Sequence, residues 1–292
     1  MSYRQTLIFS DLDGTLLDHF TYQSTAAQPT LEKLAVANIP VILTTSKTYA
    51  EVKVLQQKLA LTTPFIIENG AAIYIPIGTF AQQPEGTELK GGYWVKSFCS
   101  GHEHWLALLA KHSGEFQGCY QSFSNMSVPE LSVLTGLTPE EAERAKQREY
   151  GEPIHWLGDN QTKQQFIEKL TAMGASVLHG GRFIHIAGHC DKGQALAWLT
   201  NQYRKEFTAN SSQKPSMRTI ALGDGENDVA MLQAADCAVQ IRSPVHSFPH
   251  LNRQQFVMQT RHFGPEGWAE AISFLLADQL TSNSRNLEVN HG

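Results

Sequence analysis

The sequence predicts an α/β protein in which both ends of the chain build one sheet domain. Short apolar runs typical of buried strands alternate with helical patterns before residue 80, the alternation returns after residue 188, and the segment between them has a different, more charged texture. Strands that alternate with helices imply a parallel sheet covered by helices on both faces. We therefore expect a Rossmann-like core (residues 1–80 and 188–280), an inserted α+β domain (81–187) and a polar tail (281–292).

The elements of the core follow in strand and helix order. Before the insertion we expect a strand at 6–9, a helix through Leu31 and Leu34, a strand from Ile39, a helix at 48–59 and a strand at 64–67. Thr48 and Glu51 form a capping-box pattern that fixes where the second helix starts. After the insertion we expect a helix from Asp191, a strand at 219–223, a helix at 226–235, a strand at 237–241 and a closing amphipathic helix at 264–280.

The inserted segment mixes strands and helices without regular alternation. We expect a strand at 91–98, helices at 102–112, 138–150 and 159–174, and a hairpin at 176–188 that turns at Gly180 and Gly181. His102 and His104 are two residues apart and do not share a helix face, so a solvated helix start is favoured over a metal site. His185 and His189 flank the return to the core, where we expect a hinge or structural role.

Composition excludes several classes of function. The net charge of −5 over 292 residues provides no basic field for nucleic acid. The apolar run near the N-terminus is too short for a signal peptide or a membrane span, so we expect a cytoplasmic protein without a membrane partner. The cysteines are scattered and form no C-x-x-C pair, which favours ordinary buried thiols over a disulfide framework or a zinc site. They are Cys99, Cys119, Cys190 and Cys237.

Polar side chains follow several of the predicted strands. In a parallel sheet the carboxyl ends of the strands meet at one edge, where ligands bind. The residues expected to converge there are Asp11, Asp13, Thr45, Glu68, Asn69, Asp224 and Asp228. Asp11 and Asp13 repel each other unless a cation lies nearby, and hard carboxylate oxygens from two strand ends suit Mg²⁺.

Each cluster also has a simpler interpretation. The "DLDG" stretch alone is compatible with a turn, "TTSKT" with a polar strand end and a helix cap, and "GDGEND" has the composition of a calcium loop. The last stretch lacks the register and the distant Glu of an EF-hand, however. All of them in this order, with Lys192 between the second and the last, favour one catalytic site.

The same stretches resemble a known family. "DLDGTLLD", "TTSKT", "DKGQAL" and "GDGENDVAML" are similar to the four motifs of the haloacid dehalogenase superfamily of phosphatases, and the insertion lies where that superfamily carries its type 2 cap. More narrowly, "TSKTYAEV", "PFIIENGAAIYIP", "TGLTPEEAERAKQREYGEP" and "GGRFIHI" resemble the mannosyl-3-phosphoglycerate phosphatases within it. General sugar phosphatases of the superfamily usually have T-G-R where this chain has T-S-K at 45–47.

The resemblance implies roles for the acidic residues and the lysine. Asp11 is the expected nucleophile, which forms an aspartyl-phosphate, and Asp13 the expected general acid and base. Asp11, Asp224 and the backbone carbonyl of Asp13 are the expected Mg²⁺ ligands. Lys192 supplies further positive charge, and Asp228 orients the metal's waters or Lys192 instead of binding the metal directly.

Other residues are expected to bind the substrate. Thr45, the amide of Ser46 and Asn227 are expected to hold phosphate oxygens at the capped helix start. The candidates for specificity are Lys47, Glu68, Asn69 and Arg182. Lys47 is suited to a substrate carboxylate or phosphate, Arg182 to the carboxylate of a glycerate group, and Glu68 and Asn69 to sugar hydroxyls.

The expected function is Mg²⁺-dependent hydrolysis of 2-(mannosyl)-3-phosphoglycerate to mannosylglycerate, a compatible solute, and phosphate. Two alternatives stay open: a broader sugar-phosphate or glucosyl-3-phosphoglycerate phosphatase, and a binding or regulatory protein that has lost catalysis. The partner is a small phosphorylated sugar-glycerate, and the sequence does not fix the oligomeric state. Asn125 stands where the resemblance leads us to expect Asp.

Overall fold

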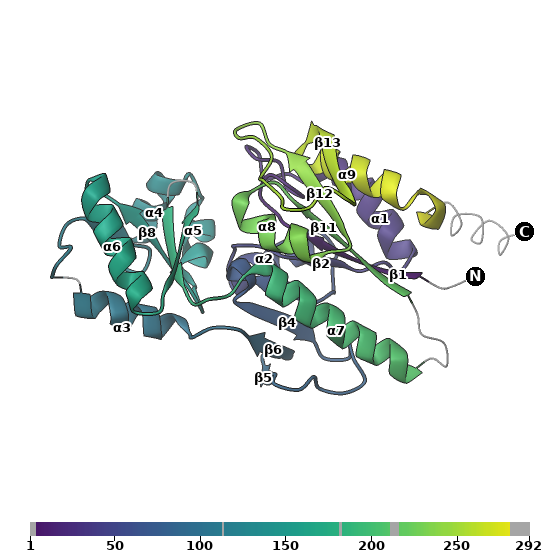
Figure 1. The fold of residues 1–292 in the computed structure, drawn as a ribbon, viewed down its shortest axis with the longest axis horizontal. Helices are drawn as coiled ribbons and strands as arrows, with labels where there is room; N and C mark the ends of the chain where they lie inside the picture. The colour runs from purple at the N-terminus through teal and green to yellow at the C-terminus, as the bar shows by residue number, and fades with distance from the viewer. Residues whose placement is uncertain (1–3, 113, 181–182, 211–215, 281–292) are drawn as a thin grey trace, which may run out of the picture.

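A computed structural model describes residues 4–112, 114–180, 183–210 and 216–280 (Figure 1). Its centre is a five-stranded sheet of order β13-β12-β11-β1-β2, in which every neighbouring pair is parallel. The strands are β1 (Arg4–Ser10), β2 (Val41–Leu43), β11 (Ser216–Gly223), β12 (Cys237–Arg242) and β13 (Val257–Phe263). The predicted α/β class with a parallel core is confirmed.

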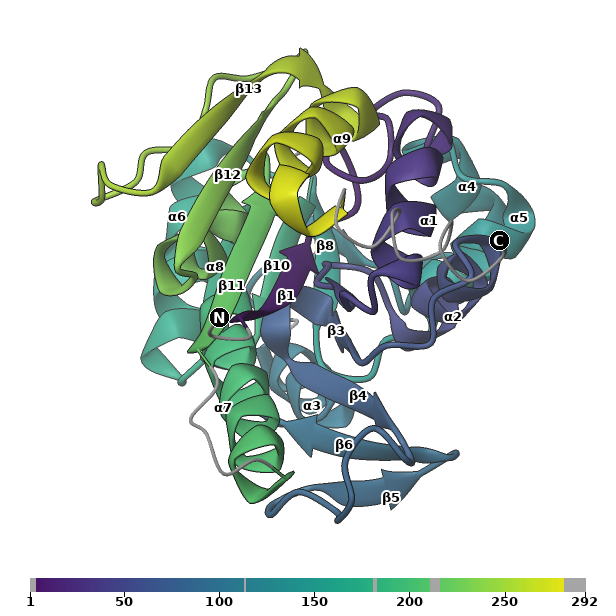
Figure 2. The ribbon, with the colours of Figure 1, turned by 90° about the vertical axis from the view of Figure 1, so that its right-hand side faces the viewer.

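Helices cover both faces of this sheet (Figures 1 and 2). One face packs against α1 (Gln28–Val36), α2 (Tyr49–Lys58) and α9 (Gly264–Leu275), the other against α7 (Lys192–Asn210) and α8 (Val229–Ala234). Because side chains alternate along a strand, Ile8 of β1 faces the first group, while Leu7 and Phe9 face the second. β1 is therefore buried on both faces, as its continuous apolar run predicts.

A second, antiparallel sheet extends the core beyond β2. Its order is β3-β4-β6-β5, and a single parallel bridge between Thr44 and Ile66 connects it to the first sheet. The strands are β3 (Phe65–Ile67), β4 (Ala72–Pro76), β5 (Glu88–Lys90) and β6 (Tyr93–Ser97). We expected the strand at 91–98 in the inserted domain, but β6 pairs with β4 instead. The division at residue 81 stays a prediction, and this pairing favours a later boundary, near Phe98.

The inserted region forms a separate body, at the left of Figure 1. Its antiparallel sheet has the order β7-β8-β10-β9, and β9 and β10 pair as the two arms of the predicted hairpin, whose Gly181 lies outside the described residues. The elements are α3 (His102–His112), β7 (Tyr120–Ser122), α4 (Val128–Thr135), α5 (Pro139–Lys146), β8 (Glu152–Trp156), α6 (Asn160–Ala172), β9 (Ser176–Gly180) and β10 (Phe183–Ala187). Trp105, Phe166 and Ile184 are buried in a hydrophobic core of its own.

Local sequence signals explain which elements were foreseen. The amide of Glu51 donates to Thr48 Oγ1 over 3.2 Å and the amide of Thr48 to Glu51 Oε2 over 2.8 Å, so the predicted capping box starts α2. β13 was missed because it is an edge strand whose side chains are mostly exposed, which leaves no apolar run to detect. Across the described residues, no helix has the length and apolar character needed to span a membrane.

Trp268 provides a test of the core. It is fully buried on α9, and its indole Nε1 donates to Ser10 Oγ over 3.0 Å. We expect Trp268→Ala to lower the free energy of unfolding by about 3–5 kcal/mol, because it leaves a large cavity. Phe274→Ala on the same helix is the control, since that ring is 74% exposed and its loss should cost no more than about 0.5 kcal/mol. Urea denaturation of both variants measures this, and equal losses would contradict the assigned packing of α9.

Candidate active site

The predicted convergence of strand ends is present. Asp11 directly follows β1, Asp224 directly follows β11, and Thr45 lies just beyond β2. Because β11, β1 and β2 are parallel neighbours, these residues share one edge of the sheet. One carboxylate oxygen from each of Asp11, Asp224 and Asp228 lies within 4.8 Å of the other two. All three side chains are buried.

Lys192 connects two of these carboxylates. It is the first residue of α7, is fully buried, and places Nζ 2.6 Å from Asp11 Oδ1 and 2.7 Å from Asp228 Oδ1. Burial alone would lower the pKa of Lys192, but Asp11 and Asp228 together raise that pKa above its ordinary value. Burial and the charge of Asp228 raise the pKa of Asp11, against the lowering effect of Lys192. The lysine therefore stays charged.

Asp228 has both carboxylate oxygens engaged by the protein. Its Oδ1 accepts from Lys192, and its Oδ2 accepts from the amides of Asp224 and Gly225, each over 3.0 Å. A Cβ on Gly223 would lie 2.5 Å from the Asp228 side chain. Because glycine has no side chain, the Asp228 carboxylate can approach the backbone amides of residues 224 and 225. This geometry supports an orienting role for Asp228 and leaves Asp11 and Asp224 as the better metal ligands.

The chemistry of the cluster fits a divalent cation. Burial and Asp228 raise the pKa of Asp224 to about 6, against the lowering effects of His246, Thr15 and Lys192. Gly14, with φ of +77°, lies so close that a Cβ there would come within 2.6 Å of Asp224 Oδ2. Three buried carboxylates with one ammonium carry excess negative charge, and hard oxygen ligands suit Mg²⁺. Asp11, Asp224 and the backbone carbonyl of Asp13 would hold the ion.

Asp13 contacts a different lysine. Its Oδ2 lies 2.7 Å from Lys47 Nζ, while its buried Oδ1 has no hydrogen-bond partner among the described residues. Burial acts to lower the pKa of Lys47, but Asp13 and Glu51 outweigh it and raise that pKa. The expected contact of Lys47 with a substrate carboxylate or phosphate stays a prediction, and in this structure its ammonium pairs with Asp13. The ring of Tyr22, 5.5 Å from Lys47 Nζ, adds a cation–π contact.

The predicted phosphate-binding residues lie beside the carboxylates. Thr45 is buried, and its Oγ1 accepts the amide of Lys47 over 3.2 Å, which shapes the turn into α2. Asn227, within the 3-10 helix η3 (Glu226–Asp228), donates through Nδ2 to Asn69 Oδ1 over 3.1 Å. This bond joins the loops after β3 and β11 across the site.

Glu68 is used within the protein. Its carboxylate is buried and accepts the backbone amides of Glu149 (2.8 Å), Tyr150 (3.3 Å) and Gly151 (2.8 Å). Burial raises the pKa of Glu68, while Arg148 at 3.8 Å and these amides oppose the rise. Glu68 therefore joins the inserted domain to the core, and its expected contact with sugar hydroxyls has no support in this geometry.

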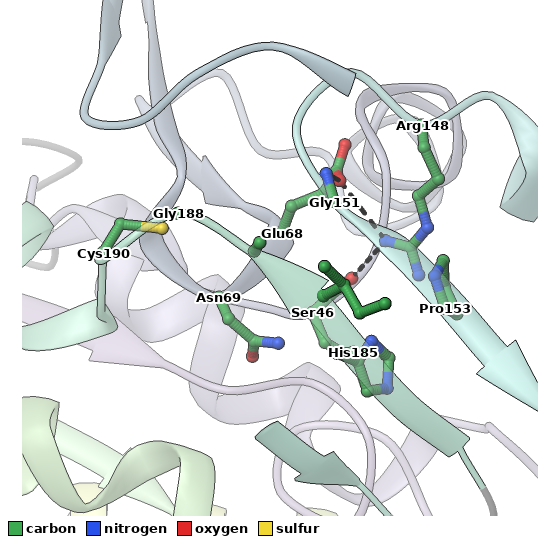
Figure 3. A pocket seen from close by; sticks show the side chains of 11 residues that line it. Ser46, Glu68, Asn69, Arg148, Gly151, Pro153, His185, Gly188 and Cys190 are labelled. Atoms are coloured by element: carbon green, nitrogen blue, oxygen red, sulfur yellow. Dashed lines mark hydrogen bonds and ion pairs between the residues drawn. The ribbon is translucent and has the colours of Figure 1, made fainter. Parts of the chain in front are cut away.

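A cavity of about 20 Å³ lies between the two bodies (Figure 3). The core contributes Ser46 and Asn69, and the inserted domain contributes Arg148 and His185. Arg148 Nη1 donates to the Ser46 carbonyl over 2.8 Å, and its Nε is buried without a hydrogen-bond partner in the described residues. Burial, assisted by Arg148, lowers the pKa of His185 to about 3, so its imidazole is neutral.

Two residues that line the cavity were not predicted from the sequence to bind substrate. Arg148 lies in the loop that joins α5 to β8, inside a stretch already noted for its resemblance, but nothing in its spacing indicates that it points toward Ser46. His185 was expected only as a hinge or structural residue. Arg182, expected to clamp the substrate carboxylate, lies outside the described residues.

Comparison with known proteins decides the family. The profile of haloacid dehalogenase-like hydrolases matches residues 8–83 and 154–245, more than half of the chain. The chain belongs to this family. A glucosyl-3-phosphoglycerate/mannosyl-3-phosphoglycerate phosphatase of Methanococcoides burtonii is 36% identical to this hydrolase over 92% of its chain and 97% of the relative. A protein of the same name from Persephonella marina is 32% identical over 91% of this chain and 95% of the relative.

Solved structures show the same fold. A haloacid dehalogenase superfamily phosphatase of Bacteroides thetaiotaomicron superposes with a TM-score of 0.62 at 17% identity, over 93% of this hydrolase and 95% of that chain. The sucrose-phosphatase of Synechocystis superposes with a TM-score of 0.56 at 17% identity, over 93% of this hydrolase and 98% of that chain. The expected family and its core-and-cap fold are confirmed.

The raised pKa of Asp224 predicts a pH-dependent affinity for Mg²⁺. Below about pH 6 the folded protein holds a proton on Asp224, and the ion must displace it. We expect Mg²⁺ to bind more weakly at pH 5 than at pH 7.5 in calorimetric titrations. Because the pKa of Asp224 is higher in the folded than in the unfolded state, the metal-free protein loses stability as pH rises from about 4 to 6, and Mg²⁺ restores it above pH 6.

Asp224→Asn is the matched variant, since it keeps the size of the side chain and removes its titration. We expect weaker Mg²⁺ binding in this variant and a smaller dependence on pH. Equal Mg²⁺ affinity at pH 5 and 7.5 in the unaltered protein would contradict the assignment of Asp224 as a ligand.

Proposed function

We propose that this hydrolase is a Mg²⁺-dependent phosphatase that removes phosphate from 2-(mannosyl)-3-phosphoglycerate and from its glucosyl analogue through an aspartyl-phosphate. The arrangement of Asp11 against Lys192, with Asp13 nearby and Asp224 in the same cluster, carries this proposal. The names of the two relatives supply the substrate class. Bound Mg²⁺ would neutralise charge on the phosphoryl group, whose negative charges otherwise repel the nucleophile.

In the first half-reaction a carboxylate oxygen of Asp11 attacks phosphorus. The bond between phosphorus and the C3 oxygen of the glycerate breaks, and Asp13 donates a proton to that leaving oxygen. Lys192 stays protonated and compensates charge at Asp11 and at the incoming phosphoryl oxygens. Thr45 and the amide of Ser46 hold phosphoryl oxygens at the start of α2.

In the second half-reaction the ionised Asp13 takes a proton from a water molecule. The resulting hydroxide attacks phosphorus, the bond to Asp11 breaks, and inorganic phosphate leaves. Lys47, 2.7 Å from Asp13 Oδ2, keeps the carboxylate turned toward the site through both steps. Asp13 Oδ1, buried and unpartnered in the described part of the chain, is the oxygen that exchanges the proton.

The remainder of the substrate extends toward the inserted domain. The cavity that begins at Ser46 and is bounded there by Arg148 and His185 has a volume of about 20 Å³ in this structure, so it must widen to admit a sugar-glycerate. Arg148 already directs one nitrogen at the Ser46 carbonyl, and its buried Nε provides a donor for the glycerate carboxylate. A neutral His185 provides a hydrogen bond to a hydroxyl without adding charge.

Asp11→Asn tests the nucleophile. An amide cannot form the acyl phosphate, so we expect turnover to fall on the order of 10⁶-fold, the scale seen when another hydrolase loses its nucleophile. The fold should persist, because the change preserves shape and removes one buried negative charge. Steady-state phosphate release and circular dichroism measure the two effects. Near-normal turnover in a folded variant would refute the role of Asp11.

Arg148→Ala tests the substrate class. We expect its KM for 2-(mannosyl)-3-phosphoglycerate to rise about tenfold to a hundredfold, as loss of a charge-assisted contact of about 1.5–3 kcal/mol implies. The KM for p-nitrophenyl phosphate, which has no glycerate, should change little. Arg144→Ala is the control, because it also removes one arginine charge but at a position on α5 that does not line the cavity. Comparable rises in KM for both substrates, or equal turnover of simple hexose phosphates by the unaltered enzyme, would contradict the proposed specificity.

A further inference from the structure

Two cysteines lie in the two segments that join the bodies. Cys99 follows β6 on the outgoing segment, and Cys190 precedes α7 on the returning one. Their sulfur atoms are 3.5 Å apart, although 91 positions separate the residues in the chain. The sequence predicted ordinary buried thiols, but both side chains are partly exposed.

The close approach is a built feature of the two segments. A Cβ on Gly188 would lie 2.3 Å from the Cβ of Cys99, so any larger residue there would push the segments apart. The amide of Cys190 donates to the Gly188 carbonyl over 2.9 Å, and this turn directs Cys190 toward its partner. Figure 3 shows the Cys190 side chain next to Gly188 at the border of the cavity.

The two thiols are chemically different. The thiol of Cys190 donates to Cys99 Sγ, and this hydrogen bond lowers the pKa of Cys99, as does the Gly188 amide, while burial opposes the effect. The same hydrogen bond and burial raise the pKa of Cys190. Because the thiolate is the reactive form, Cys99 is the sulfur that reacts first, with Cys190 in contact.

We propose that Cys99 and Cys190 form a redox modification site, which hydroperoxides oxidise to a disulfide that ties the two linking segments together. The Cys99 thiolate attacks one peroxide oxygen, the O–O bond breaks, and the products are a sulfenic acid and, after protonation, water from hydrogen peroxide. Cys190 sulfur then attacks the sulfenic sulfur, the S–O bond breaks, and a second water leaves with the Cys190 proton. The two thiols are oxidised by two electrons, and the peroxide is reduced.

A disulfide between Cys99 and Cys190 can form with little movement and would restrict motion of the inserted domain. Sulfur atoms in a disulfide are about 2.05 Å apart, so side-chain rotation must close the remaining gap. The segments that carry Cys99 and Cys190 connect the core with the inserted domain, so the bond removes their freedom to move past each other. Opening of the inserted domain over the site then becomes restricted, and exchange of substrate and product slows.

Peptide mapping after treatment with hydrogen peroxide tests the site directly. We expect a crosslinked peptide containing Cys99 and Cys190, lighter by two hydrogens than the sum of its parts and lost on treatment with dithiothreitol. Cys99→Ser and Cys190→Ser should each abolish it. Cys119→Ser, which alters a partly exposed cysteine elsewhere in the inserted domain, should leave it intact. Circular dichroism shows that each variant is folded, and Cys99→Ala and Cys190→Ala replace any serine variant that is not.

The crosslink is detected by the mass of the peptide, so this test does not depend on the proposed phosphatase activity. Oxidation of Cys99 to sulfinic acid without a crosslink, or a disulfide that involves Cys119, would overturn the proposal. For the mechanical consequence, hydrolysis of p-nitrophenyl phosphate should fall on oxidation and recover with dithiothreitol in the unaltered and Cys119→Ser proteins, but stay unchanged in Cys190→Ser. Full activity of the crosslinked protein would refute that consequence.

Discussion

The ammonium of Lys192, buried between Asp11 and Asp228, is the interaction on which the site depends. Burying this many charges is unfavourable unless each has a partner, and Lys192 pairs with two carboxylates at once. It also connects the start of α7 to the end of β1 and to η3, so the return of the chain from the inserted domain is fixed at the site itself. One lysine charge does not balance three carboxylates, and the excess negative charge favours binding of a cation.

The inserted domain is held to the core by a second set of buried polar contacts. Glu68 accepts three successive amides from the segment before β8, and Arg148 from the same segment reaches the Ser46 carbonyl. The residues that dock the domain therefore also form the wall of the cavity beside the proposed phosphate site. In the proposed mechanism Arg148 serves both substrate recognition and domain docking, which would link specificity to the position of the inserted domain.

The sequence was sufficient for the parallel core and for the carboxylates at the strand ends. Apolar runs identify β1 and β2, and parallel neighbours necessarily bring Asp11 and Asp224 to one edge. Contacts between the two bodies could not be foreseen, because they depend on the orientation of the inserted domain. The amides that Glu68 accepts from the inserted domain were therefore not predicted, and Arg148 was not singled out.

Shared chemistry limited the predictions in another way. Lys47, beside the proposed phosphate site, has the charge to bind a substrate, and only the structure shows its ammonium paired with Asp13. Likewise, no spacing in the sequence relates Cys99 to Cys190. Their proximity follows from the fact that the chain must leave and re-enter the core at neighbouring points.

Transfer of the phosphoryl group to Asp11 is the central claim, and chemical trapping of the phosphorylated enzyme tests it most directly. Substrate and enzyme are mixed with Mg²⁺, quenched in acid during turnover and reduced with borohydride, which converts a phosphorylated aspartate into homoserine. The account predicts this conversion at Asp11 alone, only when substrate is present. Phosphate release with Asp11 unmodified, or conversion at Asp13 or Asp224 instead, would contradict it.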